Sequence, residues 1–397
     1  MGIENMESNQ REYERRERKN EKKQKKRNAA WIIIILVVVA LAALKLSEVD
    51  FGKLFDSFGG SGTGISDTVS DDKNFPYKIS DDGNTFLSSV GNNLAILNDS
   101  VYAVISASNA DEKIKDIHGY ANPILYVSGG YSVIIDQGAN TYRLDSSSDN
   151  IYENSVDGEI LCADVSDTGV VAIASVAGIH KSNITVYGKS FNQRMNYNVS
   201  GGYVTSVAIS DSSKYVAFCV ISSENAKIKS TVYTMKVGDE QPISKFEYND
   251  SSILDLHFNS DDLYVVGGDF VSVIDSLDEE IPVYAKGSID TVSFCYNPSD
   301  ALVIAYGEYA GAQSNVLSYV KPSGQIKSQV EIPSQIKDVA ASGTEMTALT
   351  PSEAISFKLK NGKESGRFPV DDSYIQIWQM SSKIFGRRSS TIEIINN

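Results

Sequence analysis

A unit of two short apolar strands joined by a polar turn recurs along most of this 397-residue chain, and this repeat restricts the fold more than any other feature. In each copy an alternating apolar segment passes through a turn of Ser, Asp, Asn or Gly into a second apolar segment. Successive turns lie roughly 40 to 50 residues apart, the spacing that four strands and their connections require. The six clearest copies are ADVSDTGVVAIAS from Ala163, AISDSSKYVAFCV from Ala208, HFNSDDLYVVGG from His257, CYNPSDALVIAYG from Cys295, AASGTEMTALT from Ala340 and QMSSKIFGR from Gln379.

Two weaker copies, around Asn92 and with a turn at Ser128, precede these six. The eighth unit ends after three strands, and the segment FPYKIS at residues 75–80 can supply its missing strand. Joining the two ends in this way removes the open sheet edges that invite aggregation. We therefore predict an all-β fold, a β-propeller with eight blades favoured and seven as the alternative. The units are expected to begin near Asn84, Ala121, Glu159, Gly202, Ser251, Ser288, Gln335 and Ser373.

An array of β-sandwich domains is the rival fold, but it needs distinct linkers between its units, and the sequence shows none. Helix-periodic segments are nearly absent from the repeats, and Pro is scarce inside the strands. The composition therefore also favours a single all-β domain.

An uninterrupted apolar run, AAWIIIILVVVALAAL from Ala29 to Leu44, precedes the repeats. At 1.5 Å per residue it covers about 24 Å, or about 27 Å with the two residues that follow, the short end of a membrane-spanning helix. We expect one transmembrane α-helix at residues 29–46 in contact with the lipid bilayer. A cleaved signal peptide is the stronger alternative, although a polar region ending in a small-residue cleavage site is missing. A buried core helix is the weaker alternative.

The charges beside this run predict its orientation. Residues 1–28 hold ten Lys or Arg against six Glu, which gives +4 and, with −15 for the whole chain, leaves −19 for the rest. Positive residues beside a first span hold that end in the cytoplasm. We expect a single-pass protein of the cell membrane with residues 1–28 as a cytoplasmic tail and the C-terminal domain outside the cell. The strongly acidic remainder disfavours nucleic acid as a partner.

The chain between the span and the repeats has the composition of a tether. Residues 47–74 contain a short amphipathic stretch followed by GGSGTGISDTVSDDKN, a Gly/Ser-rich linker. The propeller domain is therefore expected at residues 75–397, closed by a strand at 75–80.

The chain's three histidines form no recognisable catalytic or metal-binding motif. His257 lies in an apolar strand and is expected to pack there, while His118 and His180 lie at turns or strand edges. The sequence contains neither GxSxG nor HExxH. A quinone-dependent dehydrogenase would need a Trp-docking motif in nearly every blade, and Trp378 is the only Trp beyond the apolar run. We predict no enzyme activity, no cofactor, and no catalytic, cofactor-binding or metal-binding residue.

The cysteines and the acidic pairs also have ordinary structural explanations. Cys162, Cys219 and Cys295 each lie inside a predicted strand of a different unit and are expected as free thiols in the core, with one disulfide as the alternative. Adjacent carboxylates could suggest calcium, but turn chemistry explains them better because a calcium loop needs oxygen ligands at fixed offsets. These pairs are Asp71-Asp72, Asp81-Asp82, Asp261-Asp262 and Asp371-Asp372.

The layout of the chain resembles a family of uncharacterised single-pass membrane proteins of Clostridia and related Firmicutes. This layout consists of a basic tail, one span, a Gly/Ser linker and repeats with turn sequences such as VAISDSSKYVAF. The resemblance extends over the whole chain. It implies a domain of unknown function with a degenerate WD40-like or quinoprotein-like β-propeller outside the membrane. The Trp-Asp and Gly-His signatures of true WD40 repeats are missing from this sequence.

The expected function is a non-catalytic binding or scaffold module of the cell envelope, with a protein or a cell-wall glycan as its ligand. A rigid ring with many variable loops suits such a role. The alternative is an envelope sensor, or a hydrolase whose site is built from the loops of several blades. Tyr120, Tyr152 and Tyr309 are candidate loop contacts, although each is expected to pack at a strand end, and the sequence names no site residue.

Overall fold

The computed structural model describes residues 75–80, 83–224, 226–309 and 312–396, which belong to the second of two compact units, Thr68–Asn397. These residues form strands, turns and bends without a helix, and the strands assemble into eight four-stranded antiparallel sheets. No helix that could cross a membrane occurs within these ranges. The expected span at residues 29–46 and the linker at 47–74 lie outside the described residues.

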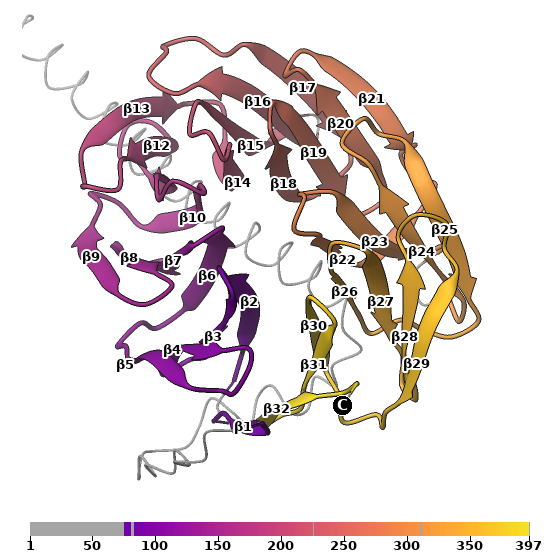
Figure 1. Cartoon of the computed structure of the whole chain (residues 1–397). Coiled ribbons are helices and arrows are strands. Elements are labelled where there is room, and N and C mark those ends of the chain that lie inside the picture. Colours follow the sequence, from indigo (N-terminus) through magenta and orange to yellow (C-terminus); the bar gives the residue numbers. More distant parts are fainter. Residues whose placement is uncertain (1–74, 81–82, 225, 310–311, 397) are drawn as a thin grey trace, which may run out of the picture. The chain divides into compact units, whose positions relative to one another are not determined.

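We number the sheets as blades in chain order (Figure 1). Blades 1 to 4 consist of β2 Phe86–Val90, β3 Asn93–Leu97, β4 Val101–Ser106 and β5 Glu112–Ile117; β6 Pro123–Ser128, β7 Tyr131–Asp136, β8 Thr141–Ser146 and β9 Asn150–Ser155; β10 Ile160–Val165, β11 Val171–Val176, β12 Ser182–Tyr187 and β13 Gln193–Val199; β14 Tyr203–Ile209, β15 Tyr215–Glu224, β16 Lys227–Lys236 and β17 Ser244–Asn249. Blades 5 to 8 consist of β18 Ile253–Asn259, β19 Asp262–Gly267, β20 Val271–Asp275 and β21 Glu279–Tyr284; β22 Asp290–Tyr296, β23 Leu302–Gly307, β24 Asn315–Val320 and β25 Ile326–Ile332; β26 Asp338–Ala341, β27 Glu345–Leu349, β28 Glu353–Lys358 and β29 Glu364–Pro369; β30 Gln376–Met380, β31 Lys383–Arg387, β32 Thr391–Ile394 and β1 Tyr77–Lys78.

The blades surround a common axis, with the first strand of each lying nearest the centre (Figure 1). Eight clusters of buried apolar side chains hold the ring together, one between each pair of neighbouring blades. The cluster between blades 8 and 1 contains Phe385 and Leu94, both with no exposed surface. Because every blade has a neighbour on both faces, the ring is closed, and the eight-blade prediction is confirmed while the seven-blade alternative is wrong.

The ring closes through the strand nearest the N-terminus. Tyr77 and Lys78 of β1 pair with Ile392 and Thr391 of β32, and β1 is the outermost strand of blade 8. The Tyr77 hydroxyl also donates a hydrogen bond of 2.9 Å to Glu112 on the outer strand of blade 1. The strand that completes the last blade thus lies inside the segment 75–80 to which the sequence assigns it.

Strand positions follow the sequence repeat closely. The first strands of the eight blades begin one to three residues after the starts predicted from the turn signals. The polar residue directly after a first strand stabilises the turn that follows, because its side-chain oxygen accepts hydrogen bonds from backbone N–H groups of that turn. The Asn297 side-chain oxygen, for example, accepts hydrogen bonds from the backbone N–H groups of Ser299 and Ala301, and Ser166 accepts them from Thr168 and Val170. These Ser, Asp and Asn turns are therefore structural, as expected from their local hydrogen-bonding chemistry.

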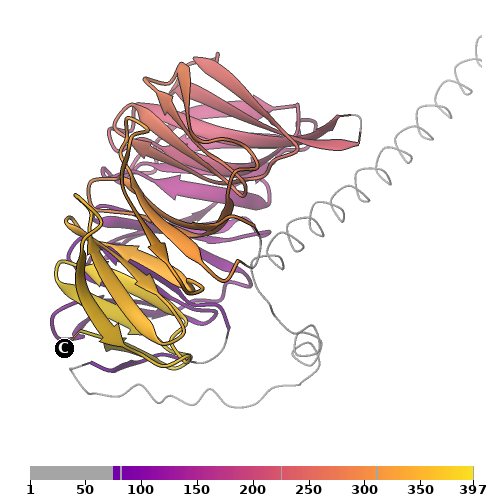
Figure 2. The ribbon, with the colours of Figure 1, turned by 90° about the vertical axis from the view of Figure 1, so that its right-hand side faces the viewer.

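Burial is greatest in the second strand of a blade, as in β7, β19 and β23, and lower in its first and outer strands. The second strand of blade 6, β23, is buried at all six positions because neighbouring blades cover both faces of the sheet. The outer strand of blade 1, β5, instead alternates exposed and partly buried residues. Blade 4 departs from this compact plan because β15 and β16 each extend over ten residues, and Figure 2 shows their hairpin projecting beyond the ring.

Candidate functional site

A cleft between blades 6 and 7 is the first candidate site. It has a volume of about 430 Å³ and opens at the turns that join the third and fourth strands of these two blades. It is lined by Tyr319, Lys321, Lys327, Gly343, Thr344, Lys358, Leu359, Lys360 and Asn361. We call it the lysine-lined cleft, since four of these nine residues are lysines.

Two hairpin turns place the lysines at the cleft. In the turn between β24 and β25, Gly324 adopts a φ of 74° and its N–H donates a hydrogen bond of 2.9 Å to the Lys321 carbonyl. In the turn between β28 and β29, Gly362 adopts a φ of 67° and donates in the same way to Lys358. Both angles lie in the left-handed region, which glycine adopts without steric cost. The Ser328 hydroxyl then joins the two hairpins with a hydrogen bond of 2.8 Å to the Leu359 carbonyl.

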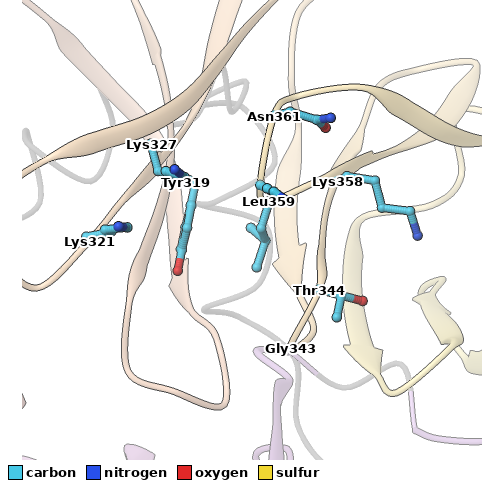
Figure 3. Close-up of a pocket in the computed structure, with 9 residues that line it drawn as sticks. Tyr319, Lys321, Lys327, Gly343, Thr344, Lys358, Leu359 and Asn361 are labelled. Atoms are coloured by element: carbon cyan, nitrogen blue, oxygen red, sulfur yellow. The ribbon is translucent and has the colours of Figure 1, made fainter.

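The walls of the cleft combine apolar and cationic groups (Figure 3). Tyr319 and Lys321 lie on the blade 6 side, and the Leu359 side chain lies opposite the Tyr319 ring. Lys358 extends away from Tyr319, toward the far side of its own hairpin (Figure 3). The cleft therefore offers a small apolar floor beside several ammonium groups.

Among the described residues, one of the four cleft lysines, Lys358, has an acidic partner. The Lys358 ammonium group lies 2.6 Å from a Glu345 carboxylate oxygen, and although burial opposes the effect, this hydrogen bond holds the pKa of Glu345 below its usual value. Within the described ranges, the side chains of Lys321, Lys327 and Lys360 make no hydrogen bond or ion pair. Lys327 and Lys360 are exposed and Lys321 is half-buried. The cleft can therefore attract an anion through charges that no carboxylate of the described residues pairs with.

A second cleft, of about 510 Å³, lies between the same two blades and has the opposite character. Its residues include Glu331, Glu353, Glu364 and Arg367. The Arg367 guanidinium group is already paired, because it contacts Glu353 and lies 2.9 Å from Glu364. This cleft therefore offers no uncompensated cation among the residues that line it.

A group of ionisable side chains lies on the inner strands of blades 3, 5 and 6. His257 of β18 stacks on Tyr296 of β22, with ring centroids 3.7 Å apart, and its Nε2 lies 3.3 Å from a carboxylate oxygen of Asp300. The Tyr296 hydroxyl donates to Asp255 at 2.8 Å. On blade 3, Asp164 accepts a hydrogen bond of 2.8 Å from the Ile209 N–H, a backbone group on the inner edge of blade 4.

Burial raises the pKa of carboxyl groups on these inner strands and on that of blade 7. It raises the pKa of Asp164 to about 7, against the stabilising hydrogen bond from Ile209. Burial likewise raises the pKa of Asp338 to about 6, although Ile377 and Ser293 donate hydrogen bonds to it. For His257, burial alone lowers the pKa, but the hydrogen bond with Asp300 and the charge of Asp255 raise it above its usual value. The arrangement stabilises a protonated imidazole among carboxylates.

Within the described ranges, no three or more His, Cys, Asp or Glu side chains converge as metal ligands. Two of the predicted acidic pairs, Asp261-Asp262 and Asp371-Asp372, can be placed, and their carboxylates serve turns. Asp262 accepts a hydrogen bond from the Ser276 N–H at 3.0 Å, and Asp371 accepts one from the Ser373 N–H at 2.9 Å. The pairs at residues 71–72 and 81–82 lie outside the described residues.

The remaining histidines lie apart from His257. The His118 Nε2 lies 2.9 Å from the Asn98 carbonyl oxygen, and the His180 Nδ1 lies 2.9 Å from the Ser200 hydroxyl. Both are partly exposed at strand ends, where the sequence predicts them. His257 lies in a strand as expected, but it contacts carboxylates rather than only apolar neighbours.

The cysteines are free thiols, as predicted. Cys162 and Cys219 are buried in the core, whereas Cys295 is only partly buried because it lies on β22 near the ring axis. Cys295 nevertheless packs against the apolar cluster between blades 6 and 7.

The three tyrosines singled out by sequence fall into different environments. Tyr152 lies within β9, not in a loop, and packs edge-on against Phe191 with centroids 5.6 Å apart. The Tyr120 hydroxyl donates to Glu153 at 3.0 Å. Tyr309 is 65% exposed, so the prediction of strand-end packing is wrong for this residue.

The sequence analysis missed the lysine-lined cleft, although a signal for it exists. The segments KPSGQIK at 321–327 and KLKNGK at 358–363 are the turns between the third and fourth strands of successive blades. Because neighbouring blades place equivalent turns side by side, two lysine-bearing turns in successive units predict a shared cationic surface.

A closed ring of eight four-stranded antiparallel sheets, with each first strand innermost, defines a WD40-like β-propeller. The crystal structure of the computationally designed Ika8 protein is similar to this chain at a TM-score of 0.55 and 13% identity, covering 78% of this chain and 94% of that one. The C-terminal WD40 domain of Sif2 matches at a TM-score of 0.53 and 11% identity, over 79% and 99% of the two chains. Saccharomyces cerevisiae Sqt1 matches at 0.52 and 9% identity, over 80% and 100%.

At such low identity these structures show the fold alone. At the level of sequence, residues 72–396 match the model of a family of unknown function, DUF5711, and the chain belongs to that family. No curated protein matches the chain.

Proposed function

We propose that this protein is a non-catalytic binding module of the cell envelope, anchored in the membrane by residues 29–46 with its propeller outside the cell. The apolar run, the basic flank before it and the acidic remainder support this location. The propeller supplies a rigid frame, since eight interblade cores fix the positions of its turns.

The observation that carries the binding role is the lysine-lined cleft. It is a concave surface at a blade boundary, with an apolar floor and cations that lack partners among the described residues. Its volume of about 430 Å³ falls within the range of small-ligand sites, which is roughly 300 to 1,000 Å³. Lysines at the rim of such a cleft can hold a charged ligand without any chemical step.

The alternative of a hydrolase would require a nucleophile within hydrogen-bond reach of a general base. His257 is the histidine with a carboxylate partner, and its ring is occupied by Asp300 and the face of Tyr296. This arrangement favours a structural role for His257. A sensor would in addition need a cytoplasmic partner for residues 1–28.

Residues 75–397 contain all the strands of the described ring, including the closing strand β1, so this fragment is suitable for binding experiments. Purified fragment should sediment with isolated cell envelopes in a saturable manner, and heat-unfolded fragment should not. Turnover of a broad panel of hydrolase substrates, without saturable envelope binding, would contradict the proposal. In intact cells, added protease should remove the propeller while leaving residues 1–28 protected.

A further inference from the structure

The lysine-lined cleft carries an excess of positive charge on an acidic protein. Lys321, Lys327 and Lys360 have no side-chain partner among the described residues, whereas Lys358 is paired with Glu345. The chain beyond residue 28 carries a net charge of −19. Three uncompensated ammonium groups at one cleft repel one another, and an anionic ligand would relieve this repulsion.

We propose that the lysine-lined cleft binds a ligand that carries more than one phosphate group. This inference rests on the proposed binding function and names the chemistry of its ligand. Arginine pairs with carboxylates and with phosphates through two parallel hydrogen bonds, whereas the lysine ammonium group is a compact point charge that binds phosphate without a fixed geometry. The nine lining residues include four lysines and no arginine.

The charge of the cleft indicates a ligand with several phosphates. A phosphodiester carries one negative charge, so the three unpaired lysines match two or three such groups, or one terminal phosphate with a neighbour. The Tyr319 ring and the Leu359 side chain face each other between the lysines (Figure 3). They provide apolar contact for the carbon units that separate phosphates along a chain.

The overall negative charge of the propeller does not prevent such binding. Salt screens charges over about 8 Å at physiological ionic strength, so an anion near the cleft interacts mainly with the adjacent lysines. The same screening predicts that affinity falls as salt concentration rises, because the contacts are between exposed charges.

The test measures binding of inorganic tripolyphosphate to residues 75–397 by isothermal titration calorimetry. Citrate, a carboxylate of comparable charge, serves as the chemical comparison. A soluble glycerol phosphate polymer and vesicles of equal parts phosphatidylglycerol and phosphatidylcholine distinguish a polymer from a lipid headgroup as the natural source of phosphate.

Two variants with the same change in charge locate the site. Lys327→Gln with Lys360→Gln removes two cations from the cleft, and we expect it to weaken tripolyphosphate binding at least about tenfold. Lys113→Gln with Lys214→Gln changes two exposed lysines on blade 1 and blade 4, and we expect less than about a twofold effect. Both variants should unfold at the temperature of the parent, because the four side chains are exposed.

Tight binding of tripolyphosphate over citrate, lost only in the cleft variant, supports the proposal. Equal binding of tripolyphosphate and citrate, or equal loss in both variants, overturns it. Binding to vesicles without binding to tripolyphosphate or the polymer also overturns it. If the fragment still binds cell envelopes while the cleft variant binds them equally well, the ligand assignment fails and the broader binding function stands.

Discussion

The imidazole of His257 and the phenol of Tyr296 lie face to face, with centroids 3.7 Å apart and planes inclined by 15°. They join the inner strands of blades 5 and 6, β18 and β22, which approach each other less closely than the other neighbouring first strands. The hydrogen bond from Tyr296 to Asp255 and the contact of His257 with Asp300 extend this junction. Polar side chains therefore link the inner strands of these two blades beside the apolar cluster that lies between them.

The carboxyl group of Asp164 near this junction should make stability depend on pH. Burial raises its folded-state pKa to about 7, while an aspartate in an unfolded chain titrates near 3.9. The folded state thus binds a proton that the unfolded chain releases, and stability falls as the pH rises from about 4 to about 7. The raised pKa of His257 acts in the same direction, since its stabilising charge is lost as the pH rises through that folded-state value.

We expect Asp164→Asn to raise the melting temperature at pH 8 by about 3 °C, corresponding to about 2 kcal/mol for a domain of this size. The asparagine oxygen can still accept the hydrogen bond from Ile209. Thermal melts at pH 5 and pH 8 measure the effect, with Asp278→Asn, at an exposed position, as the matched control. An identical pH profile for both variants and the parent would contradict this prediction.

Arg143 should be essential to the packing of blades 1 and 2. Its side chain is 6% exposed, and it donates two hydrogen bonds to the fully buried Asp145, at 2.8 and 2.7 Å. Its guanidinium group also contacts Asp116 on β5 of blade 1. Removing a buried cation leaves the carboxylate unpaired in a poorly solvated place, so Arg143→Met should cost about 3 to 5 kcal/mol of unfolding free energy.

The double variant Arg143→Met with Asp145→Leu removes both charges and should recover at least half of that loss. Urea denaturation of the two variants and of Asp145→Leu alone completes the cycle. If the double variant is as unstable as Arg143→Met, the cost arises from lost packing over Tyr102 and not from the unpaired charge.

Deleting the closing strand should expose a sheet edge. A fragment that begins at residue 83 lacks β1, and with it the pairing of Tyr77 with Ile392 and the contact of Phe75 with Phe385, whose ring centroids are 5.2 Å apart. We expect lower stability and concentration-dependent association, because β32 then presents unpaired N–H and C=O groups. Light scattering after size-exclusion chromatography compares it with residues 75–397, and a monodisperse, equally stable fragment would rule out this role for β1.

The thiols should be inert in the folded protein. Burial raises the pKa of Cys219 to about 11 and raises the pKa of Cys162 and Cys295 above the usual range for a thiol. Since the thiolate is the reactive form, a disulfide-exchange reagent at pH 8 should label none of the three within minutes. In denaturant without reductant it should label all three, and detection of only one would indicate a disulfide.

The sequence predicts the architecture well because the fold repeats a local pattern. Alternating strands and Ser, Asp or Asn turns depend on short-range chemistry, as in the capping of the turn by Asn297. The pairing of Tyr77 with Ile392 can be predicted for a different reason. The eighth unit of the sequence contains only three strands, so its fourth strand must come from another part of the chain.

The candidate site depends on contacts that no single turn reveals. Lys321 and Lys360 lie in separate hairpins of neighbouring blades, and only the packing of blade 6 against blade 7 brings them to one cleft. The partner of each charged residue is equally non-local. Lys358 is neutralised by Glu345, thirteen residues away, whereas Lys327 has no partner among the described side chains.

The two-residue strand β1 also determines how the propeller responds to force. Residues 1–74 join the ring directly before it, so tension along that part of the chain reaches the blades through the pairing of Tyr77 and Lys78 with β32. Such a short ladder would yield before the longer strands, whose hydrogen bonds are more numerous. Blade 8 would then lose one strand while seven blades stayed intact. We therefore expect β1 to be the first strand to detach when the N-terminal segment is pulled.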